Sequence, residues 1–242
     1  MVADFPLILE AGEWNAVAIA AEQLSTEVLD AERELLTRPD LHRRLGLPRA
    51  ICKVLRAVTH ENVANGAARI MRFDFHFTPD GWRISEVNAD VPGGFIEASG
   101  FTELMADCYP SYTTPKNPAN AYLDAIVNAA GEGRLVGLAH ATAHYDDRQV
   151  MQYLAEGLHR RGMRTLLLSP AHLEWQSGFA RTTGPFGKSP VDLLVRFFPA
   201  EWLPNLRRRS LWEPWFCAGK TAMSNPGIAL FGQSKRFPLV WP

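Results

Sequence analysis

The chain has 242 residues and a mass of 27.0 kDa, and its 25 Lys and Arg residues nearly balance its 26 Asp and Glu residues, for a net charge of −1. A hydrophobic content of 47% predicts a globular protein with a sizeable core and excludes intrinsic disorder. The even charge balance argues against a dedicated binder of nucleic acid or of a membrane surface, which would carry a basic excess.

Cysteine usage and hydropathy favour the cytoplasm. The three cysteines are scattered and odd in number, so neither a disulfide framework nor a CxxC metal site is expected. The first thirty residues lack a basic stretch followed by an apolar run, so no signal peptide is expected. No run approaches the roughly 18 apolar residues that a transmembrane helix needs.

The N-terminal part is predicted to be helical. In residues 13–37, Trp14, Val17, Leu24 and Val28 recur at helical spacing, and Pro39 lies just beyond. A second helix is expected over residues 48–66.

A β-hairpin is predicted next, because residues 71–77 alternate strictly between apolar and polar side chains. The sequence Thr-Pro-Asp-Gly at 78–81 is typical of a turn, and residues 82–88 return as the second strand. Residues 96–107 are expected to be helical.

The remaining chain predicts a parallel sheet, since a strand, a helix and a second strand follow one another in a βαβ unit. A Pro-rich linker is expected at 110–118 and a loop at 176–190, and the last forty residues show no clear period. The expected regular elements are a helix at 119–129, a strand at 134–139, a helix beginning near Asp146 or Asp147 and ending at Gly162, and strands at 165–168 and 191–198.

The register of the hairpin decides which side chains meet. A three-residue loop with a bulge at Gly81 would place Asp74 opposite Glu86 and Arg72 opposite Asn88, all on one face. The phenylalanines at 73, 75 and 77 would then form the core face. A plain two-residue loop would shift this pairing by one residue.

Two opposed carboxylates repel each other, so this face needs a cation. Arg72 supplies one candidate, and Mg²⁺ is the other, because the side chains of Asp74, Glu86 and Asn88 offer the hard oxygen ligands that Mg²⁺ takes. From the spacing alone, a solvated polar face with an Arg–Asp pair remains the alternative.

The same residues resemble a known family. The sequences RFDF at 72–75 and EVNAD at 86–90 are similar to the N-terminal part of glutathionylspermidine synthase. Further similarity in the same order lies at 146–154, 196–202 and 225–241, so that the resemblance covers about residues 14–242.

The resemblance implies an ATP-dependent ligase that forms a carbon–nitrogen bond by activating a carboxylate as an acyl phosphate, which an amine then attacks. It implies an α/β fold, namely a Rossmann-like βαβ pre-ATP-grasp region together with an N-terminal helical and hairpin part of a permuted ATP-grasp fold. ATP and Mg²⁺ are the implied co-substrate and cofactor. Arg72 would stabilise the phosphoryl group, and the metal ligands would be Asp74, Glu86 and Asn88. The residues expected near the substrate are Asp90, Gly93, Gly94 and Glu97.

Three ranges are expected: 1–110 with the helices and the metal and substrate half-site, 119–205 as the pre-ATP-grasp domain, and 206–242 as the start of a connection to an ATP-binding lobe. The sequence stops where that lobe would begin in the family, so we expect a truncated ligase that is inactive as given. The expected partner is an ATP-grasp lobe in trans or a second copy of the chain in a homodimer. A non-catalytic module that binds a small molecule or peptide is the alternative.

Overall fold

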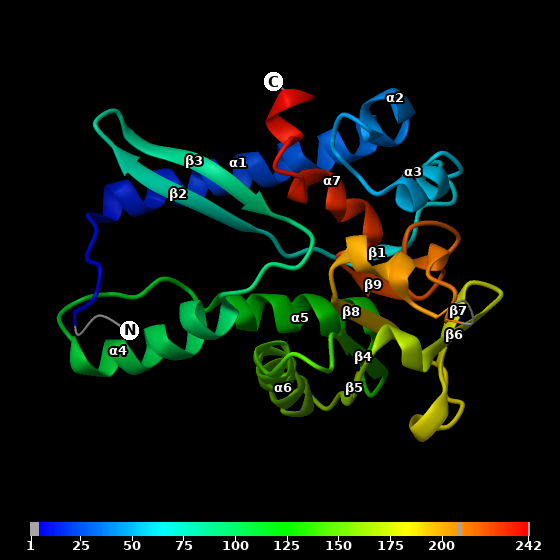
Figure 1. Cartoon of the computed structure of the whole chain (residues 1–242). Coiled ribbons are helices and arrows are strands. Elements are labelled where there is room, and N and C mark those ends of the chain that lie inside the picture. The colour runs from blue at the N-terminus through cyan, green and yellow to red at the C-terminus, as the bar shows by residue number, and fades with distance from the viewer. Residues whose placement is uncertain (1–4, 208–209, 242) are drawn as a thin grey trace.

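The computed structural model describes residues 5–207 and 210–241, and its centre is a five-stranded parallel sheet (Figure 1). The strand order is β1-β9-β8-β4-β5, which confirms the predicted α/β class. The strands are β1 (Gly66–Ala68), β4 (Leu135–His140), β5 (Arg164–Leu168), β8 (Leu193–Phe197) and β9 (Ala222–Ser224).

Helices α5 (Pro118–Ala130) and α6 (Tyr145–His159) pack on one face of this sheet. Their apolar residues meet the alternate strand residues Val136, Leu138 and Val195, all of which are buried. The predicted βαβ unit is thus confirmed, with α6 connecting β4 to its parallel neighbour β5. Asn117 caps α5, because its side chain accepts a hydrogen bond from the Asn120 backbone N–H.

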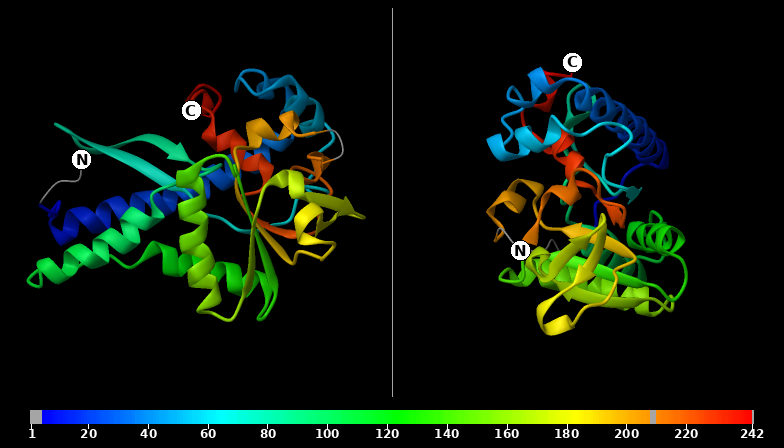
Figure 2. Two further views of the ribbon diagram at one scale, coloured as in Figure 1. Left: turned by 60° about the horizontal axis from the view of Figure 1, so that its bottom comes forward. Right: turned by 90° about the vertical axis from the view of Figure 1, so that its right-hand side faces the viewer.

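The opposite face is covered by helices from both ends of the chain (Figure 2). This core contains the fully buried rings of Trp215, Phe216 and Phe231. The helices on this side are α1 (Ala11–Leu36), α2 (Pro39–His42), α3 (Arg49–Leu55) and α7 (Leu230–Gln233).

The N-terminal helices differ from expectation in one place. The helix predicted over 13–37 is confirmed as α1, but the helix predicted over 48–66 was wrong beyond Leu55. After α3 the chain turns, and Gly66–Ala68 joins the sheet as β1. The helical segment predicted at 96–107 is confirmed as a π-helical turn, Glu97–Phe101, followed by α4 (Thr102–Cys108).

The predicted hairpin is present as β2 (Arg72–Thr78) and β3 (Gly81–Asn88), but its irregularity lies elsewhere. Thr78 pairs with Gly81, so the loop has two residues, and the predicted bulge at Gly81 was wrong. The register shifts instead between Asp74 and Phe75, where Ser85 is the extra residue on β3. This bulge restores the predicted opposition of Asp74 and Glu86, and of Arg72 and Asn88.

The predicted core face of the hairpin was also wrong, because the hairpin projects away from the sheet (Figure 1). The Phe77 side chain is 66% exposed, and Phe73 and Phe75 are only half-buried.

Several short elements were not predicted, among them α2, β1 and α7. The region 176–190, expected to be a loop, contains part of a second hairpin, β6 (Leu173–Gln176) and β7 (Phe179–Thr182), with Ser177 and Gly178 in the turn at positive φ. Strand β9, in the region without a period, inserts between β8 and β1. The sheet therefore takes strands from all three expected ranges of the chain. Within the described residues, no helix is both long and apolar enough to cross a membrane.

Candidate active site on the β2–β3 hairpin

The centre of the candidate site is a bidentate pair between Arg72 and Asp74 at the base of the hairpin. The guanidinium Nε and Nη2 donate to the two carboxylate oxygens of Asp74 over 2.7 and 3.0 Å. These hydrogen bonds lower the pKa of Asp74 and raise that of Arg72. Both side chains remain partly open, at 45% and 35% exposure, so the pair is accessible to a ligand.

Asn88 and Glu86 complete this face from the neighbouring strand. The Asn88 amide nitrogen donates to Asp74 Oδ2 over 3.3 Å. Glu86 lies opposite Asp74 and forms an ion pair with Lys235 from the C-terminal segment. A hydrogen bond from the Lys235 ammonium lowers the pKa of Glu86. Each of the two carboxylates therefore has its own cation.

The C-terminal segment, residues 225–241, also holds the end of strand β3 in place at the site. Gln233 Nε2 donates to Asn88 Oδ1 over 3.3 Å, and Gln233 Oε1 accepts from the Asp90 backbone N–H over 3.1 Å. This side chain fixes the amide of Asn88, so that its nitrogen faces Asp74. Helix α7 thereby positions the end of β3.

Asp90, expected to contact substrate, is buried in an ion pair with Arg196, the fourth residue of β8. Arg196 Nη2 lies 2.5 Å from one carboxylate oxygen, and the other accepts from the Ala200 backbone N–H over 2.9 Å. The two side chains are 0% and 4% exposed. Both oxygens of Asp90 are thus used within the protein, where they connect the hairpin to the sheet.

Asn225 extends the same network from a strained backbone position, φ 53°. Its amide group exchanges hydrogen bonds with both backbone groups of Ile70, which leads into the hairpin, and its backbone carbonyl accepts from Arg196 Nε over 2.8 Å. A non-glycine residue at positive φ persists where its surroundings fix it. The entry to β2 and the exit from β3 are therefore tied to one point.

The loop after β3 carries the other expected substrate residues. The Gly93 backbone carbonyl accepts from Arg72 Nη1 over 3.4 Å, and Gly94 has φ +95°. A Cβ at Gly94 would lie 3.6 Å from Arg72 Cδ, so this loop passes closely along the arginine. Glu97 begins the π-helical turn with an exposed side chain. The buried ring of Phe95 anchors the loop on α5.

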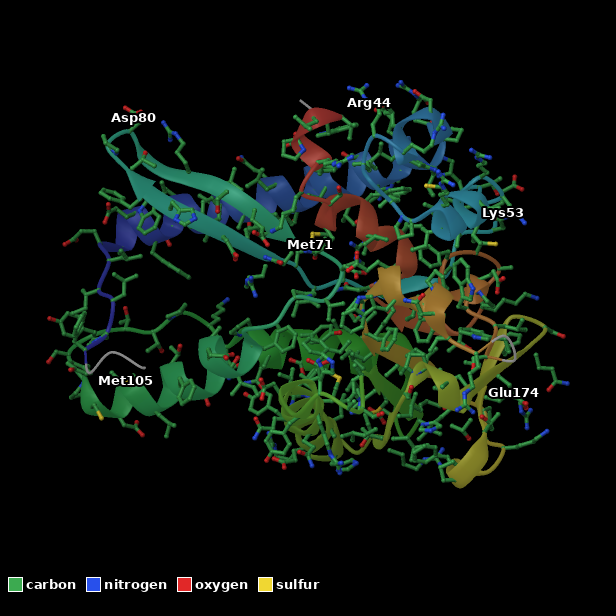
Figure 3. The ribbon with its side chains drawn as sticks, viewed as in Figure 1. Arg44, Lys53, Met71, Asp80, Met105 and Glu174 are labelled. Carbon is green, nitrogen blue, oxygen red and sulfur yellow. The ribbon has the colours of Figure 1, made fainter. Side chains whose placement is uncertain are left out.

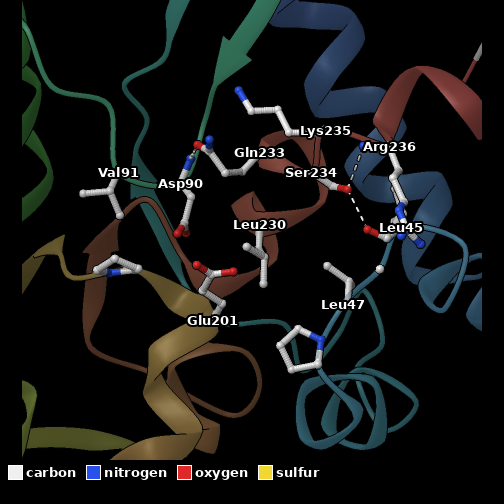
Figure 4. A pocket seen from close by; sticks show the side chains of 13 residues that line it. Leu45, Leu47, Asp90, Val91, Glu201, Leu230, Gln233, Ser234, Lys235 and Arg236 are labelled. Carbon is white, nitrogen blue, oxygen red and sulfur yellow. Dashed lines mark hydrogen bonds between the residues drawn. The ribbon is translucent and has the colours of Figure 1, made fainter.

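A pocket of about 450 Å³ adjoins this network (Figure 4). Its walls come from the loop after α2, the residues after β3 and β8, and the C-terminal segment. Figure 4 shows Glu201 and Arg236 on opposite sides of the pocket, with Leu47 and Leu230 between them. Gly46 has φ +76°, and the Arg236 side chain lies along its backbone, 3.5 Å from where a Cβ would be.

The donor set of the hairpin fits a hard cation. Asp74 and Glu86 supply carboxylate oxygens. The Asn88 amide oxygen accepts from Gln233, so this amide would have to turn to add a third oxygen ligand. Within residues 5–207 and 210–241, no group of three or more His, Cys, Asp and Glu side chains is arranged to hold a metal ion. Two carboxylates and an amide suit Mg²⁺, which completes its shell with water and substrate phosphates.

Comparison with known proteins assigns the family. The family model described as glutathionylspermidine synthase preATP-grasp matches residues 5–241. The chain belongs to this glutathionylspermidine synthase pre-ATP-grasp family. No curated protein matches the chain. The family match covers the hairpin with its Arg72–Asp74 pair and the C-terminal segment with Lys235.

Sequence reasoning assigned no role to Gln233, Lys235, Arg196 or Asn225, which hold the hairpin site of this pre-ATP-grasp chain in place. The only signal was that the segments 196–202 and 225–241 resemble the family. Which side chains those segments bring to the hairpin depends on tertiary structure.

Proposed function

We propose that the chain carries the phosphoryl-stabilising half-site of an ATP-dependent carbon–nitrogen ligase with a permuted ATP-grasp architecture. The observation that carries the proposal is the accessible Arg72–Asp74–Asn88 cluster with Glu86 opposite Asp74. Its composition supports this function because a guanidinium and hard oxygen ligands are what a transferring phosphoryl group requires.

Asp74, Glu86 and Asn88 would hold Mg²⁺, which supplies charge neutralisation on the phosphoryl oxygens. Asp74 holds the guanidinium of Arg72 at this face through its two hydrogen bonds, so that Arg72 lies close to where phosphoryl oxygens would bind. Lys235 adds a second cation at the same face. Ligand binding would redirect the cations from carboxylates to phosphoryl oxygens.

The adjoining pocket is proposed to hold the substrates. Arg236 suits a carboxylate, and Glu201 suits an amine on the facing wall. The apolar residues between them suit the stem of a peptide or of another organic acid. Asp90 and Asn225 act as positioning residues in this proposal, because their polar atoms are engaged inside the protein.

Catalysis is proposed to need a nucleotide-binding lobe, from a longer chain or in trans, because the hairpin face is open to solvent. Phosphoryl transfer depends on positioning and on exclusion of water, which one open face does not provide. A non-catalytic binding module is the second candidate, favoured by the pairing of both carboxylates with Arg72 and Lys235.

Binding of Mn²⁺ as a paramagnetic stand-in for Mg²⁺ tests the half-site. We expect Asp74→Asn and Glu86→Gln to weaken the binding of Mn²⁺. The control Glu174→Gln removes a carboxylate on β6 that is paired with Lys188, and it should leave the binding of Mn²⁺ unchanged. Equal binding by all four proteins would contradict the metal site. If the chain alone hydrolyses ATP and Asp74→Asn abolishes this activity, no further lobe is needed. If the chain binds metal but shows no ligase activity together with a nucleotide-binding lobe, the non-catalytic binding module is favoured.

A further inference from the structure

A second cavity, of about 550 Å³, lies at the N-terminal ends of the central strands. Its walls come from the β6–β7 hairpin and from the segments that lead into β1, β8 and β9. Figure 3 shows Glu174 on β6 and Asp80 at the tip of the β2–β3 hairpin on opposite sides of the molecule. We call this space the β7 cavity, and the side chains that matter below all line it: Phe179, Arg181, Asp192, Lys220 and Thr221.

Two cations and one aromatic ring converge in the β7 cavity. Phe179 and Arg181 are two residues apart on β7, so their side chains lie on the same face of that strand. Lys220 approaches from the segment before β9, and its Nζ lies 5.7 Å from the centre of the Phe179 ring. Phe179 is 53% exposed, so the cavity presents a flat apolar surface beside positive charge.

A buried hydroxyl group adds a hydrogen-bond donor to the wall of the cavity. Thr221 is 3% exposed, and its Oγ1 accepts from the Ala180 backbone N–H over 2.7 Å. A hydroxyl group can donate one hydrogen bond while it accepts another, and that of Thr221 donates to no described residue. Because Thr221 lines the cavity, its hydrogen is available to an oxygen atom of a ligand.

The acid that lines the cavity does not neutralise its cations. One carboxylate oxygen of Asp192 accepts from the Leu135 backbone N–H over 2.8 Å, and the other lies 3.6 Å from Arg134 Nη1. Neither Arg181 nor Lys220 forms an ion pair with a described residue. An exposed cation without an ion partner is common on a protein surface, but here two of them share one cavity with an aromatic ring.

The backbone beside the cavity is held in unfavourable conformations. Ser177, at φ 51°, and Ala218, at φ 59°, are non-glycine residues with positive φ. A Cβ at Gly178 would lie 2.5 Å from the Ala218 carbonyl oxygen, and the Gly178 carbonyl accepts from the Lys220 backbone N–H over 2.7 Å. Such strain persists where the surrounding structure fixes it, and it is concentrated at ligand sites. Here it fixes the segments that carry Phe179 and Lys220.

We propose that the β7 cavity binds a small organic anion with a planar ring, as in an aromatic carboxylate or a nucleoside monophosphate. The ring would stack on Phe179, and the anionic group would pair with Arg181 and Lys220 and accept from the Thr221 hydroxyl. The volume lies within the range of small-molecule sites, about 300–1,000 Å³. Among the described residues, the cavity shares none with the hairpin site, so it is a second binding site.

Calorimetric titration of the full chain with adenosine monophosphate and with indole-3-acetate tests the site. EDTA is present throughout, so that no divalent metal carries the nucleotide to the hairpin. Tighter binding of adenosine monophosphate would identify a nucleotide as the ligand, and tighter binding of indole-3-acetate an aromatic acid. The ring alone, as adenosine or indole, and the anion alone, as phosphate or acetate, should each bind at least about tenfold more weakly.

Two variants locate the bound probe. Lys220→Met removes the charge and keeps an apolar stem, and it should weaken binding about tenfold. Phe179→Leu removes the aromatic face and should weaken binding about fivefold. The control Lys188→Met removes a lysine that is paired with Glu174 outside the cavity, and it should leave binding unchanged.

Thermal unfolding verifies that each variant folds, and Lys220→Met should do so because Lys220 is exposed. If neither probe binds below about 5 mM, the proposal is overturned. Equal binding by the parent, Lys220→Met and Phe179→Leu would overturn it as well. Binding that is weakened by Asp74→Asn but not by Lys220→Met would place the probe at the β2–β3 hairpin, with the same consequence.

Discussion

The ammonium group of Lys235 lies against the carboxylate of Glu86, so the carboxylate opposite Asp74 already has a cation. The candidate metal site is thus neutralised by Arg72 on one strand and by the C-terminal segment on the other. A metal ion that binds here must displace Lys235 from Glu86.

This competition predicts that Lys235→Met strengthens binding of Mg²⁺ in the absence of nucleotide. Because the Lys235 side chain is 70% exposed and its charge is screened by solvent, the gain in affinity should be modest, about two- to fivefold. Calorimetric titration with MgCl₂ measures it, and Lys188→Met, which frees Glu174 on β6, is the matched control. Unchanged or weaker binding by Lys235→Met would show that Glu86 is not a ligand.

The two ion pairs also determine what Glu86→Gln should do to stability. Asp74 and Glu86 each have a cation, so removing one charge relieves little repulsion and also breaks the contact with Lys235. Without metal, the melting temperature of the variant should differ little from that of the parent. Millimolar Mg²⁺ should raise the melting temperature of the variant less than that of the parent, since only the folded state presents the site. Identical responses to Mg²⁺ would count against Glu86 as a ligand.

Loss of either partner of the buried Asp90–Arg196 pair should be severe. Asp90→Ala leaves the guanidinium buried without a counter-ion and the Ala200 N–H without an acceptor, for an expected loss of about 3–5 kcal/mol in the free energy of unfolding. Urea unfolding checks this value. The double variant Asp90→Leu/Arg196→Met should lose less than the sum of the single changes, and additive losses would mean that the pair is not coupled.

His42 predicts a loss of stability in mild acid. Its ring is buried against Phe231, Nε2–H donates to the Leu35 carbonyl over 2.7 Å, and Nδ1 has no partner among described residues. Burial lowers the pKa of His42 from 6.5, so the unfolded chain binds the proton more readily than the folded chain. The stability that depends on neutral His42 is therefore fully present above pH 6.5, and it decreases as the pH falls below that value.

The variant His42→Gln tests this assignment, because it removes the titrating group and retains a donor for the Leu35 carbonyl. Its melting temperature should fall less steeply than that of the parent between about pH 7.5 and 5.5. Burial lowers the pKa of His140 as well, so some dependence on pH should remain. Equal slopes for parent and variant would exclude His42 as the source.

Gly94→Ala should be destabilising, because φ +95° is unfavourable for a residue with a Cβ. The expected cost is about 1–3 kcal/mol and comes from the backbone conformation, since the new Cβ would lie at an ordinary contact distance of 3.6 Å from Arg72 Cδ. Gly100→Ala is the control, since its Cβ would meet no atom within 4 Å and its φ is not positive. Equal stability of both variants would contradict the strained conformation of the loop.

Local patterns predicted the parts of the fold that local forces determine. The apolar runs predicted as strands at 134–139 and 191–198 are confirmed as β4 and β8, and the structure shows that both strands are buried along their whole length in the sheet. The Pro-Asp turn located the hairpin, but the position of its bulge was misjudged because two-residue and three-residue loops share the same turn residues.

Other features depend on contacts between distant segments. Strand β9 has only three residues, too few for a period to be seen, and it is a strand because β8 and β1 flank it. Gln233 and Lys235 lie in a segment without periodicity, and only folding brings them to Asn88 and Glu86. The predicted opposition of Asp74 and Glu86 was confirmed, whereas their cations could not be assigned from sequence.

The order of strands in the sheet has a consequence for biosynthesis. Since β9 lies between β8 and β1, a ribosome must have passed residue 224 before β1 can find its neighbour. Until then the helices that precede β1 have no finished sheet to pack on. Such non-local pairing slows folding and leaves apolar surface exposed in the nascent chain. This protein is therefore expected to acquire the stability of its sheet late in translation.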